Sequence, residues 1–309
     1  MRSGANATRE TTGLSYGLGA YLIWGLVPLY WPLLAAASAT EILAHRIVWS
    51  LLCAGILLLV LRRRRWWRSI CRPRTLGLLA AASVFIAVNW GLYIWAVNHG
   101  HVVEAALGYY INPILSVLLG VVILRERLAA AQWVAVGLAG AAVVVLAVDY
   151  GHPPWVSLIL AVSFATYGLL KNRINSGALE TLTVESAMLT PLALGYLIWL
   201  QATGALVFGH HGISQALLLA SSGLVTLIPL LLFAGAAIRL PLSTMGLLQY
   251  LTPTAQFLLG VFYFGEAMSP ARWIGFGLVW VALIVLTLTG LRDAVRRRRD
   301  DNIRAVEPI

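Results

Sequence analysis

The stretch LGYYINPILSVLLGVVILRERLAAAQWVAVG (107–137) returns 140 residues later (from 107 to 247) as LLQYLTPTAQFLLGVFYFGEAMSPARWIGFG (247–277). Matches of Leu or Val are cheap in so apolar a chain, but paired Pro, Glu, Trp and Tyr at one offset are not. The coincident pairs are Leu107/Leu247, Tyr110/Tyr250, Pro113/Pro253, Gly120/Gly260, Glu126/Glu266, Trp133/Trp273 and Gly137/Gly277. The sequence therefore predicts an internal duplication, which decides the fold.

The composition is that of a membrane protein. The 309 residues are 60% hydrophobic and 11% charged, with a mean hydropathy of +0.83. Soluble domains carry about 25% charged residues. The apolar residues form runs of roughly twenty, a length that crosses the hydrocarbon core of a bilayer as a helix. Apart from closed β-barrels, only helices satisfy all of their backbone hydrogen-bonding groups there. The first run, 14–34, is longer than the core of a cleaved signal peptide, so it is interpreted as an uncleaved span.

The runs and breaks predict an all-α integral membrane protein with ten transmembrane helices. They are 14–34, 40–61, 75–97, 103–124, 130–148, 155–172, 181–203, 214–237, 243–264 and 270–290. We expect a polar cytoplasmic N-terminus at 1–13, two five-helix repeats at 14–148 and 155–290, and a basic cytoplasmic tail at 291–309. Because five is odd, the second repeat enters the membrane from the opposite side. Such inverted repeats build many secondary transporters, which open alternately to the two sides.

Basic residues alternate between the connections. Arginine and lysine fill the even-numbered loops and both tails, whereas the odd-numbered loops are nearly free of them. The positive-inside rule therefore places both termini in the cytoplasm, in a multi-pass protein of the cytoplasmic membrane. This distribution also accounts for the net charge of +10. Anionic lipid at the cytoplasmic face is the expected contact, and no nucleic-acid partner is needed. A homo-oligomer is left open.

Three ionisable residues open the second span. Glu41 and His45 share one helix face, and Arg46 is rotated by about 100° from His45. Ionisable groups in a span are functional candidates, since each costs about 2.5–3.5 kcal/mol at a helix centre. An arginine on the outer side runs against the charge pattern of this chain, so we expect Glu41 and His45 to partner Arg46 in an outward-opening cleft. Helix capping by Glu41 and snorkelling of Arg46 are the alternatives.

Polar and aromatic residues near the two prolines extend the candidate site. Proline inside a span frees a backbone carbonyl, and paired interruptions in the two repeats point to a binding site. Pro113 and Pro253 are therefore the expected hinges. The candidate substrate-binding residues are Trp24, Glu41, His45, Arg46, Asn89, Tyr93, Tyr110, Asn112, Gln249 and Tyr250. For each aromatic residue, packing or an interfacial belt is the competing interpretation.

No cofactor or metal is expected. The stretch HGHVVE (99–104) places histidines near a glutamate, but solvated loop histidines explain it as well. The chain contains no H-E-x-x-H motif, no nucleophile elbow and no P-loop with GK[ST], so neither an enzyme nor an ATP-driven pump is predicted.

Several long motifs resemble a known family. AYLIWGLVPLYWPLL (20–34), EILAHRIVWS (41–50), NWGLYIWAVNHGHVVEAALGYYINPILSVLLGVVILRERL (89–128) and LSTMGLLQYLTPTAQFLLGVFYFGE (242–266) resemble RarD-type permeases of the EamA family, in the drug/metabolite transporter superfamily. The resemblance covers about Leu14 to Leu291. It implies a ten-helix permease of two EamA-like repeats, commonly linked to export of metabolites or drugs.

The expected function is therefore secondary transport of a small amphipathic organic metabolite or drug by alternating access, in the direction of export. Glu41 and His45, which face outward under a proton gradient, motivate the hypothesis of proton coupling. The alternative is a flippase for a lipid-linked carrier, in which Arg46 would contact a phosphate.

Overall fold

The computed structural model describes residues 2–62, 66–70, 72–124, 129–174 and 176–304. Some residues singled out in the sequence lie outside this part of the chain. They are Glu126 of the first repeat, the loop arginines Arg63, Arg64, Arg65, Arg125 and Arg127, and Cys71.

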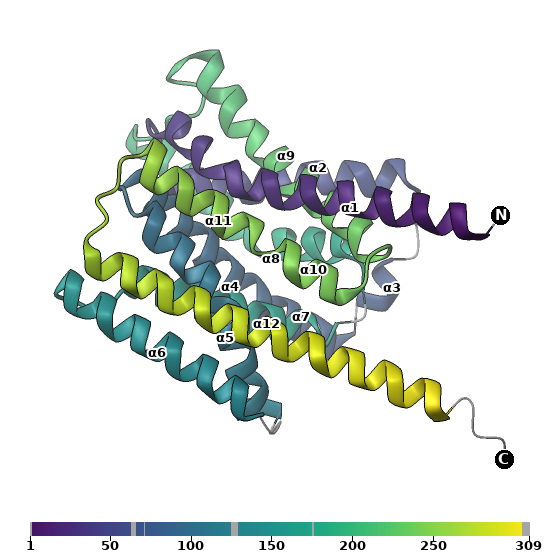
Figure 1. Cartoon of the computed structure of the whole chain (residues 1–309). Helices are drawn as coiled ribbons and strands as arrows, with labels where there is room; N and C mark the ends of the chain where they lie inside the picture. The colour runs from purple at the N-terminus through teal and green to yellow at the C-terminus, as the bar shows by residue number, and fades with distance from the viewer. Residues whose placement is uncertain (1, 63–65, 71, 125–128, 175, 305–309) are drawn as a thin grey trace.

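Every regular element in the described residues is helical (Figure 1). The first repeat contains α1 (Arg2–Leu26), the short turns η1 (Val27–Leu29) and η2 (Trp31–Leu34), α2 (Ala39–Val60), the short α3 (Trp67–Ile70), α4 (Pro73–Asn98), α5 (Val102–Leu124) and α6 (Ala130–Tyr150). The second contains α7 (Trp155–Lys171), α8 (Ala178–Thr203), α9 (Gly212–Ala237), α10 (Leu242–Leu248), α11 (Leu251–Leu258), the π-helical η3 (Leu259–Tyr263) and α12 (Pro270–Arg304).

The predicted ten-span bundle is confirmed. Seven of the described helices are long and apolar enough to cross a membrane, namely α2, α4, α5, α6, α8, α9 and α12. The apolar α7 is shorter, at 17 residues, and α1 and the broken segment α10–α11–η3 complete the bundle. Both chain ends lie at one end of the bundle, which we call the termini end (Figure 1). We call the opposite end the histidine end, because His99, His101, His152, His210 and His211 lie in its connections.

The helix bounds repeat as the sequence does. α2 and α8 begin at Ala39 and Ala178, and α4 and α9 occupy 73–98 and 212–237, an offset of 139 residues (39 to 178, 73 to 212). α6 and α12 begin at Ala130 and Pro270, an offset of 140 (130 to 270). The two offsets differ by one residue. The repeat therefore extends to the positions at which these helices begin and is not confined to the matched motifs.

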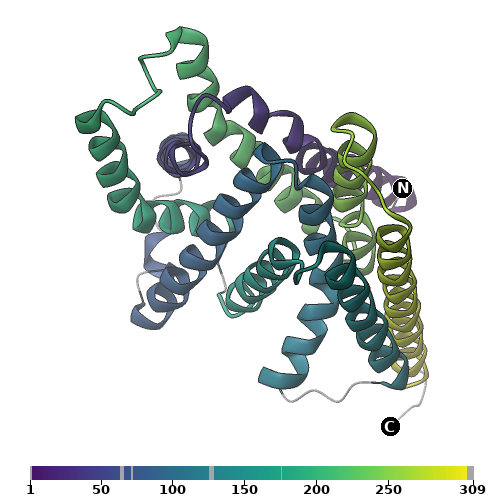
Figure 2. The ribbon, with the colours of Figure 1, turned by 90° about the vertical axis from the view of Figure 1, so that its left-hand side faces the viewer.

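Each helix of one repeat has a counterpart in the other. α2 packs against α8, α5 against α11, and α6 against α12, which are counterparts in each case. α1 packs on α9 and α11, and its counterpart α7 packs on α4 and α5. Figure 2 looks from the histidine end and shows α6 and α12 side by side, with α2 flanked by α8 and α9. This arrangement is that of two inverted repeats related by a pseudo-two-fold axis.

The outer boundaries of the bundle differ from the sequence prediction. α1 begins at Arg2 rather than near residue 14, and α12 continues to Arg304 rather than ending near 290. The reason is that polar residues do not by themselves end a helix, and no proline interrupts either extension (2–13 and 291–304). Hydropathy limits the apolar part of a helix but not the helix itself.

The ninth span is not one continuous helix. The chain turns at Gln249 and Tyr250, between α10 and α11. Pro253 has no N–H with which to donate to the carbonyl of Gln249, four residues earlier, so the helical ladder fails there. Pro113 occupies the corresponding position in α5, which nevertheless remains continuous from Val102 to Leu124.

Two counterpart helix pairs are packed differently. α2 and α9 lie together along much of their length, whereas their counterparts α8 and α4 meet over a shorter stretch. At the α2–α9 contact, a Cβ on Gly223 would lie 2.5 Å from the backbone carbonyl of Trp49. With the offset of 139, the counterpart of Gly223 is Val84 (84 to 223), whose side chain is 57% exposed. The close contact midway along α2 and α9 therefore has no equally close counterpart between α8 and α4.

Replacing Gly223 with alanine is expected to lower the stability of the bundle. The added methyl overlaps the backbone of α2, and overpacking of this kind costs about 1–3 kcal/mol. Thermal unfolding in detergent or nanodiscs measures the change. Gly140→Ala in α6 is the matched control, because nothing lies within 4 Å of its added Cβ, and a helical Gly→Ala change by itself favours folding. Equal melting temperatures for the two variants would contradict the close contact.

Candidate functional site

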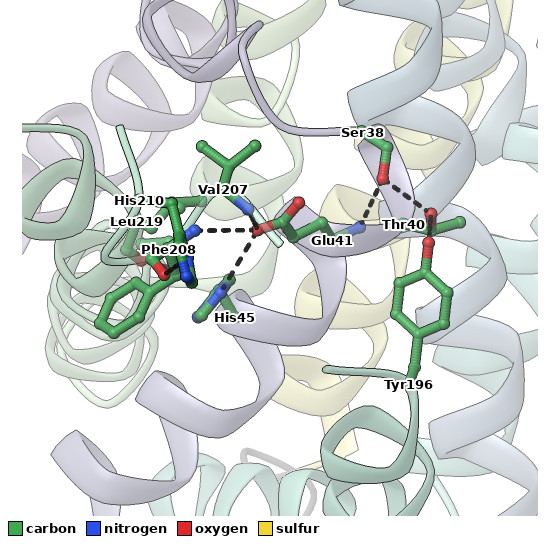
Figure 3. A network of polar contacts seen from close by, with 10 residues as sticks. Ser38, Thr40, Glu41, His45, Tyr196, Val207, Phe208, His210 and Leu219 are labelled. Carbon is green, nitrogen blue, oxygen red and sulfur yellow. Dashed lines mark hydrogen bonds and ion pairs between the residues drawn. The ribbon is translucent and has the colours of Figure 1, made fainter. Parts of the chain in front are cut away.

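Glu41 and His45 hold a loop onto the start of α2 (Figure 3). The Oε1 atom of Glu41 accepts hydrogen bonds from the N–H groups of Val207 (2.9 Å) and Phe208 (3.3 Å). The ring of His45 stacks on that of Phe208 with centroids 4.7 Å apart, and its Nε2 lies 3.9 Å from Glu41 Oε1. Ser38, rather than Glu41, caps the helix, because its Oγ accepts from the N–H of Glu41 at 3.2 Å. Both side chains are buried and serve the connection between α8 and α9.

Arg46 points elsewhere. Its Nε donates to Thr226 Oγ1 in α9 at 2.9 Å. The guanidinium carbon lies 3.8 Å from the centroid of the Trp90 ring and 5.3 Å from that of Trp31. Glu41 and His45 therefore do not partner Arg46, contrary to the expectation from sequence. The rotation of about 100° per residue turns Arg46 toward α4 and α9, while Glu41 and His45 face the 205–211 connection.

Asn89 joins three helices. Its Nδ2 donates to the carbonyl of Leu160 (3.0 Å) and to Ser163 Oγ (3.1 Å) in α7. Its Oδ1 accepts from the hydroxyl of Tyr109 in α5 at 3.0 Å. The amide is buried and satisfied on both sides, so it fixes α4 against α5 and α7.

Tyr93 and Asn112 keep unused polar atoms. The hydroxyl of Tyr93 is buried without a hydrogen-bond partner, and its ring packs edge-on against Tyr109 with centroids 5.6 Å apart. The Nδ2 of Asn112 is also buried without a partner, although its Oδ1 accepts from Ser116 at 3.2 Å. Buried polar groups normally find partners, so the Tyr93 hydroxyl and the Asn112 Nδ2 are candidates for contact with a ligand.

The remaining candidates lie around α1, α5 and α11. The hydroxyl of Tyr110 bonds with Thr254 Oγ1 at 2.8 Å across the α5–α11 contact. The ring of Trp24 packs against Phe233 with centroids 5.8 Å apart. Gln249 is exposed, and Tyr250 is half-buried at the break between α10 and α11. The candidate residues thus fall into separate groups rather than one cluster. Arg46 and Tyr93 lie near one another. Tyr110 and Tyr250 belong to one hydrophobic cluster, and Trp24 belongs to a different one.

One buried polar cluster was not included among the candidates from sequence. Lys171 Nζ lies 2.8 Å from Glu185 Oε1 and also bonds with Thr181. The hydroxyl of Tyr167 donates to Glu185 Oε2 at 3.2 Å. The signal was available, since Glu185 is an acidic residue inside an apolar span. The charge alternation counts Lys171 among the basic residues of a loop, because the end of a helix cannot be located from hydropathy to within one turn.

Carboxylates also bind helix starts at the histidine end. Glu266 accepts from the N–H groups of Val102 (2.5 Å) and Val103 (2.9 Å), the first residues of α5. Glu104 accepts from the N–H of Val156 at the start of α7 at 3.1 Å. Both use the partial positive charge of a helix N-terminus. Burial raises the pKa of the Glu266 carboxyl, and its two backbone hydrogen bonds oppose that change.

The histidines at the histidine end do not assemble a metal centre in the part of the chain that the structure describes. No group of three or more His, Cys, Asp or Glu side chains is placed to hold an ion there. His101 Nδ1 does lie 3.2 Å from Glu104 Oε2, while His99 stacks on Trp95 with centroids 4.7 Å apart.

A duplicated, inverted bundle of ten helical spans, with polar and aromatic side chains buried between the repeats, defines a membrane transporter. Residues 11–148 match the EamA-like transporter family, which corresponds to the first repeat. The chain is 61% identical to protein RarD of Streptomyces exfoliatus over 94% of its own length and 92% of that protein. The chain therefore belongs to the EamA-like transporter family and is a RarD-type member of it.

Two further relatives and one solved structure agree. The chain is 44% identical to an uncharacterized transporter of Bacillus subtilis, over 91% of this chain and 95% of that one. It is 39% identical to protein RarD of Escherichia coli, over 96% and 98%. A crystal structure of a protein 20% identical to this chain superposes with a TM-score of 0.60, over 91% of this chain and 98% of that one. At this identity the superposition shows the fold alone.

Asn89→Leu is expected to destabilise the bundle by about 1–3 kcal/mol, because it leaves the Tyr109 hydroxyl and the polar groups of α7 without the amide. Asn112→Leu is the matched control, since one end of that amide has no partner in the structure. Thermal unfolding of the two variants measures the difference. Equal losses of stability would show that Asn89 is not the structural tie described here.

Proposed function

We propose that this protein moves a small amphipathic organic solute across the membrane by alternating access, as a secondary transporter. The observation that supports it is the unequal packing of counterpart helix pairs in a duplicated bundle. α2 meets α9 closely at Trp49 and Gly223, and the counterpart contact of α8 with α4 is shorter. In an inverted repeat, exchange of these two arrangements between the halves closes one end and opens the other.

The direction proposed is export from the cytoplasm. The basic loops and tails favour a cytoplasmic position for the termini end by the positive-inside rule. With that orientation, export, to which the permeases that this chain resembles are commonly linked, runs from the termini end to the histidine end. The aromatic side chains of Trp31, Trp90 and Tyr93 offer flat surfaces for an apolar body.

The orientation can be tested with reporter fusions in cells. A fluorescent protein that matures only in the cytoplasm is expected to fluoresce when fused after Ile309. Fused after His152, at the histidine end, it is expected to remain dark, while an alkaline phosphatase at that position is expected to be active. The reverse pattern would place the termini outside and would remove the argument for export.

Proton coupling is proposed through Glu41 and His45, which lie within 3.9 Å of one another at the histidine end. Glu41→Gln keeps an oxygen that can accept from Val207 and Phe208 but removes the titratable charge. We expect it to abolish accumulation driven by a proton gradient while exchange of solute across the membrane persists. Glu10→Gln, at an exposed position of α1, is the control and is expected to accumulate solute like the parent.

The measurement is flux into proteoliposomes from a mixed metabolite pool, read by mass spectrometry, with and without a proton gradient. Protein-dependent movement of a soluble organic solute is expected. Accumulation by Glu41→Gln equal to that of the parent would contradict the coupling role. Movement of fluorescent lipid between leaflets without movement of any soluble solute would instead favour a lipid flippase, and would overturn the proposed function.

A further inference from the structure

Arg46 is a buried charge without an ionic partner. The residue belongs to α2 and is only 8% exposed. None of the ion pairs within the described residues includes it, and its Nε donates to the neutral Thr226. Buried charges are normally paired, because their transfer from water is costly. The partly buried Lys171 and Arg272 are paired in this way. Lys171 lies 2.8 Å from Glu185, and Arg272 lies 2.9 Å from Asp149.

The groups around Arg46 have unused hydrogen-bonding capacity. The indole nitrogen of Trp31 is buried without a partner, as is the hydroxyl of Tyr93, which lies within electrostatic reach of the guanidinium. Ser50, four residues after Arg46 and on the same helix face, has a buried hydroxyl that is also unpartnered. An indole N–H can only donate, and the two hydroxyls can donate. The site therefore combines a positive charge with free donors.

The nearby tyrosines with satisfied hydroxyls frame this group. Tyr30 bonds to the carbonyl of Leu218 at 2.5 Å and to Ser221 at 2.9 Å, and Tyr109 donates to Asn89 at 3.0 Å. They supply aromatic surface, and their hydroxyl groups already bond within the protein. Trp90 stacks on the guanidinium at 3.8 Å. Such stacking orients the planar fork of an arginine, which matches carboxylate and phosphate oxygens.

We propose that Arg46 binds the anionic group of the transported solute, a carboxylate or a phosphate, with Tyr93 and Trp31 as additional donors. The substrate class is an amphipathic organic anion with a flat apolar body that contacts the surrounding aromatic rings. This inference rests on the proposed transport function, because it names the substrate class of the same pathway. It assigns Arg46 to ligand binding, whereas Asn89 serves the packing described above.

The test uses direct binding, so that it does not depend on transport. The full chain in nanodiscs of zwitterionic lipid is incubated with radiolabelled phenylacetate, and bound label is measured by scintillation proximity. Saturable binding is expected, with competition by unlabelled phenyl phosphate and with at least tenfold weaker competition by the neutral phenylacetamide. Absence of saturable binding, or equal competition by the amide, would overturn the proposal.

Four variants identify the site. Arg46→Gln is expected to weaken phenylacetate binding about tenfold or more, as expected for loss of a hydrogen bond to a charged group, and Arg46→Lys by less. Tyr93→Phe removes a hydroxyl that bonds to nothing in the structure, so its melting temperature should match the parent while binding weakens severalfold. Arg239→Gln is the matched control, since Arg239 donates to the carbonyl of Gly235 and lies over the ring of Tyr16, away from Arg46. Unchanged binding by both Arg46→Gln and Tyr93→Phe would refute the assignment, and the folded Tyr93→Phe decides the matter if Arg46→Gln fails to fold.

A lipid headgroup and a soluble acid present the same chemistry, and the nanodisc composition separates them. If anionic lipid in the nanodisc competes with phenylacetate for the parent, and the competition disappears in Arg46→Gln, the anion is a lipid phosphate. If anionic lipid has no effect, the anion is soluble. Both results support an anion site at Arg46. Arg46-dependent binding without any flux in proteoliposomes would keep this inference while removing the proposed function. Flux that shows no preference for anions and no dependence on Arg46 would keep the proposed function while removing this inference.

Discussion

The fold depends on one constraint, which is that a bilayer core offers no water to backbone polar groups. Each span must therefore satisfy its own N–H and C=O groups, and all described regular elements are helices. Among the described spans, the ninth departs from that rule at Gln249 and Tyr250, where Pro253 leaves the carbonyl of Gln249 without its helical donor. The α11 segment after this turn packs on α1 and α5.

The same constraint decides where charge is found. Glu41, Glu104 and Glu266 lie at the histidine end and accept from backbone N–H groups that no helix satisfies. Glu185 and Lys171 lie near the other end and neutralise each other. Arg46 has neither solution in the structure, although it is buried. The difference explains why Glu104 and Glu266 are best understood as structural and why we assign Arg46 to a ligand.

Much of the fold could be predicted from the sequence, because hydropathy and a 140-residue repeat are local or pairwise patterns. The paired prolines and the alternation of arginines fixed the number and order of spans. The break at Gln249 was not predicted, since Pro113 stands at the matching position of a continuous helix. Whether a proline interrupts a span depends on the neighbours of the freed carbonyl, and those neighbours come from other parts of the chain.

The candidate site was predicted less completely for a similar reason. Spacing correctly placed Glu41 and His45 on one face, but the expectation that they partner Arg46 was wrong, because Arg46 faces Thr226 and Trp90. It could not reveal that the 205–211 connection covers the carboxylate, because residues 166 positions apart in the chain (41 to 207) share no sequence pattern. Asn89 was selected for its polarity, but polarity alone does not distinguish an amide with three internal hydrogen bonds from one that faces a solute.

The carboxylate contacts at the histidine end restrict the sequence in an unusual way. Glu41, Glu104 and Glu266 recognise main-chain N–H groups at residues 207, 208, 156, 102 and 103. Every amino acid except proline supplies that group. In related chains these five positions could therefore exchange side chains, within the limits of packing, without loss of these hydrogen bonds at the histidine end. Only the arrival of a proline there, or the loss of the glutamate, would break the contact.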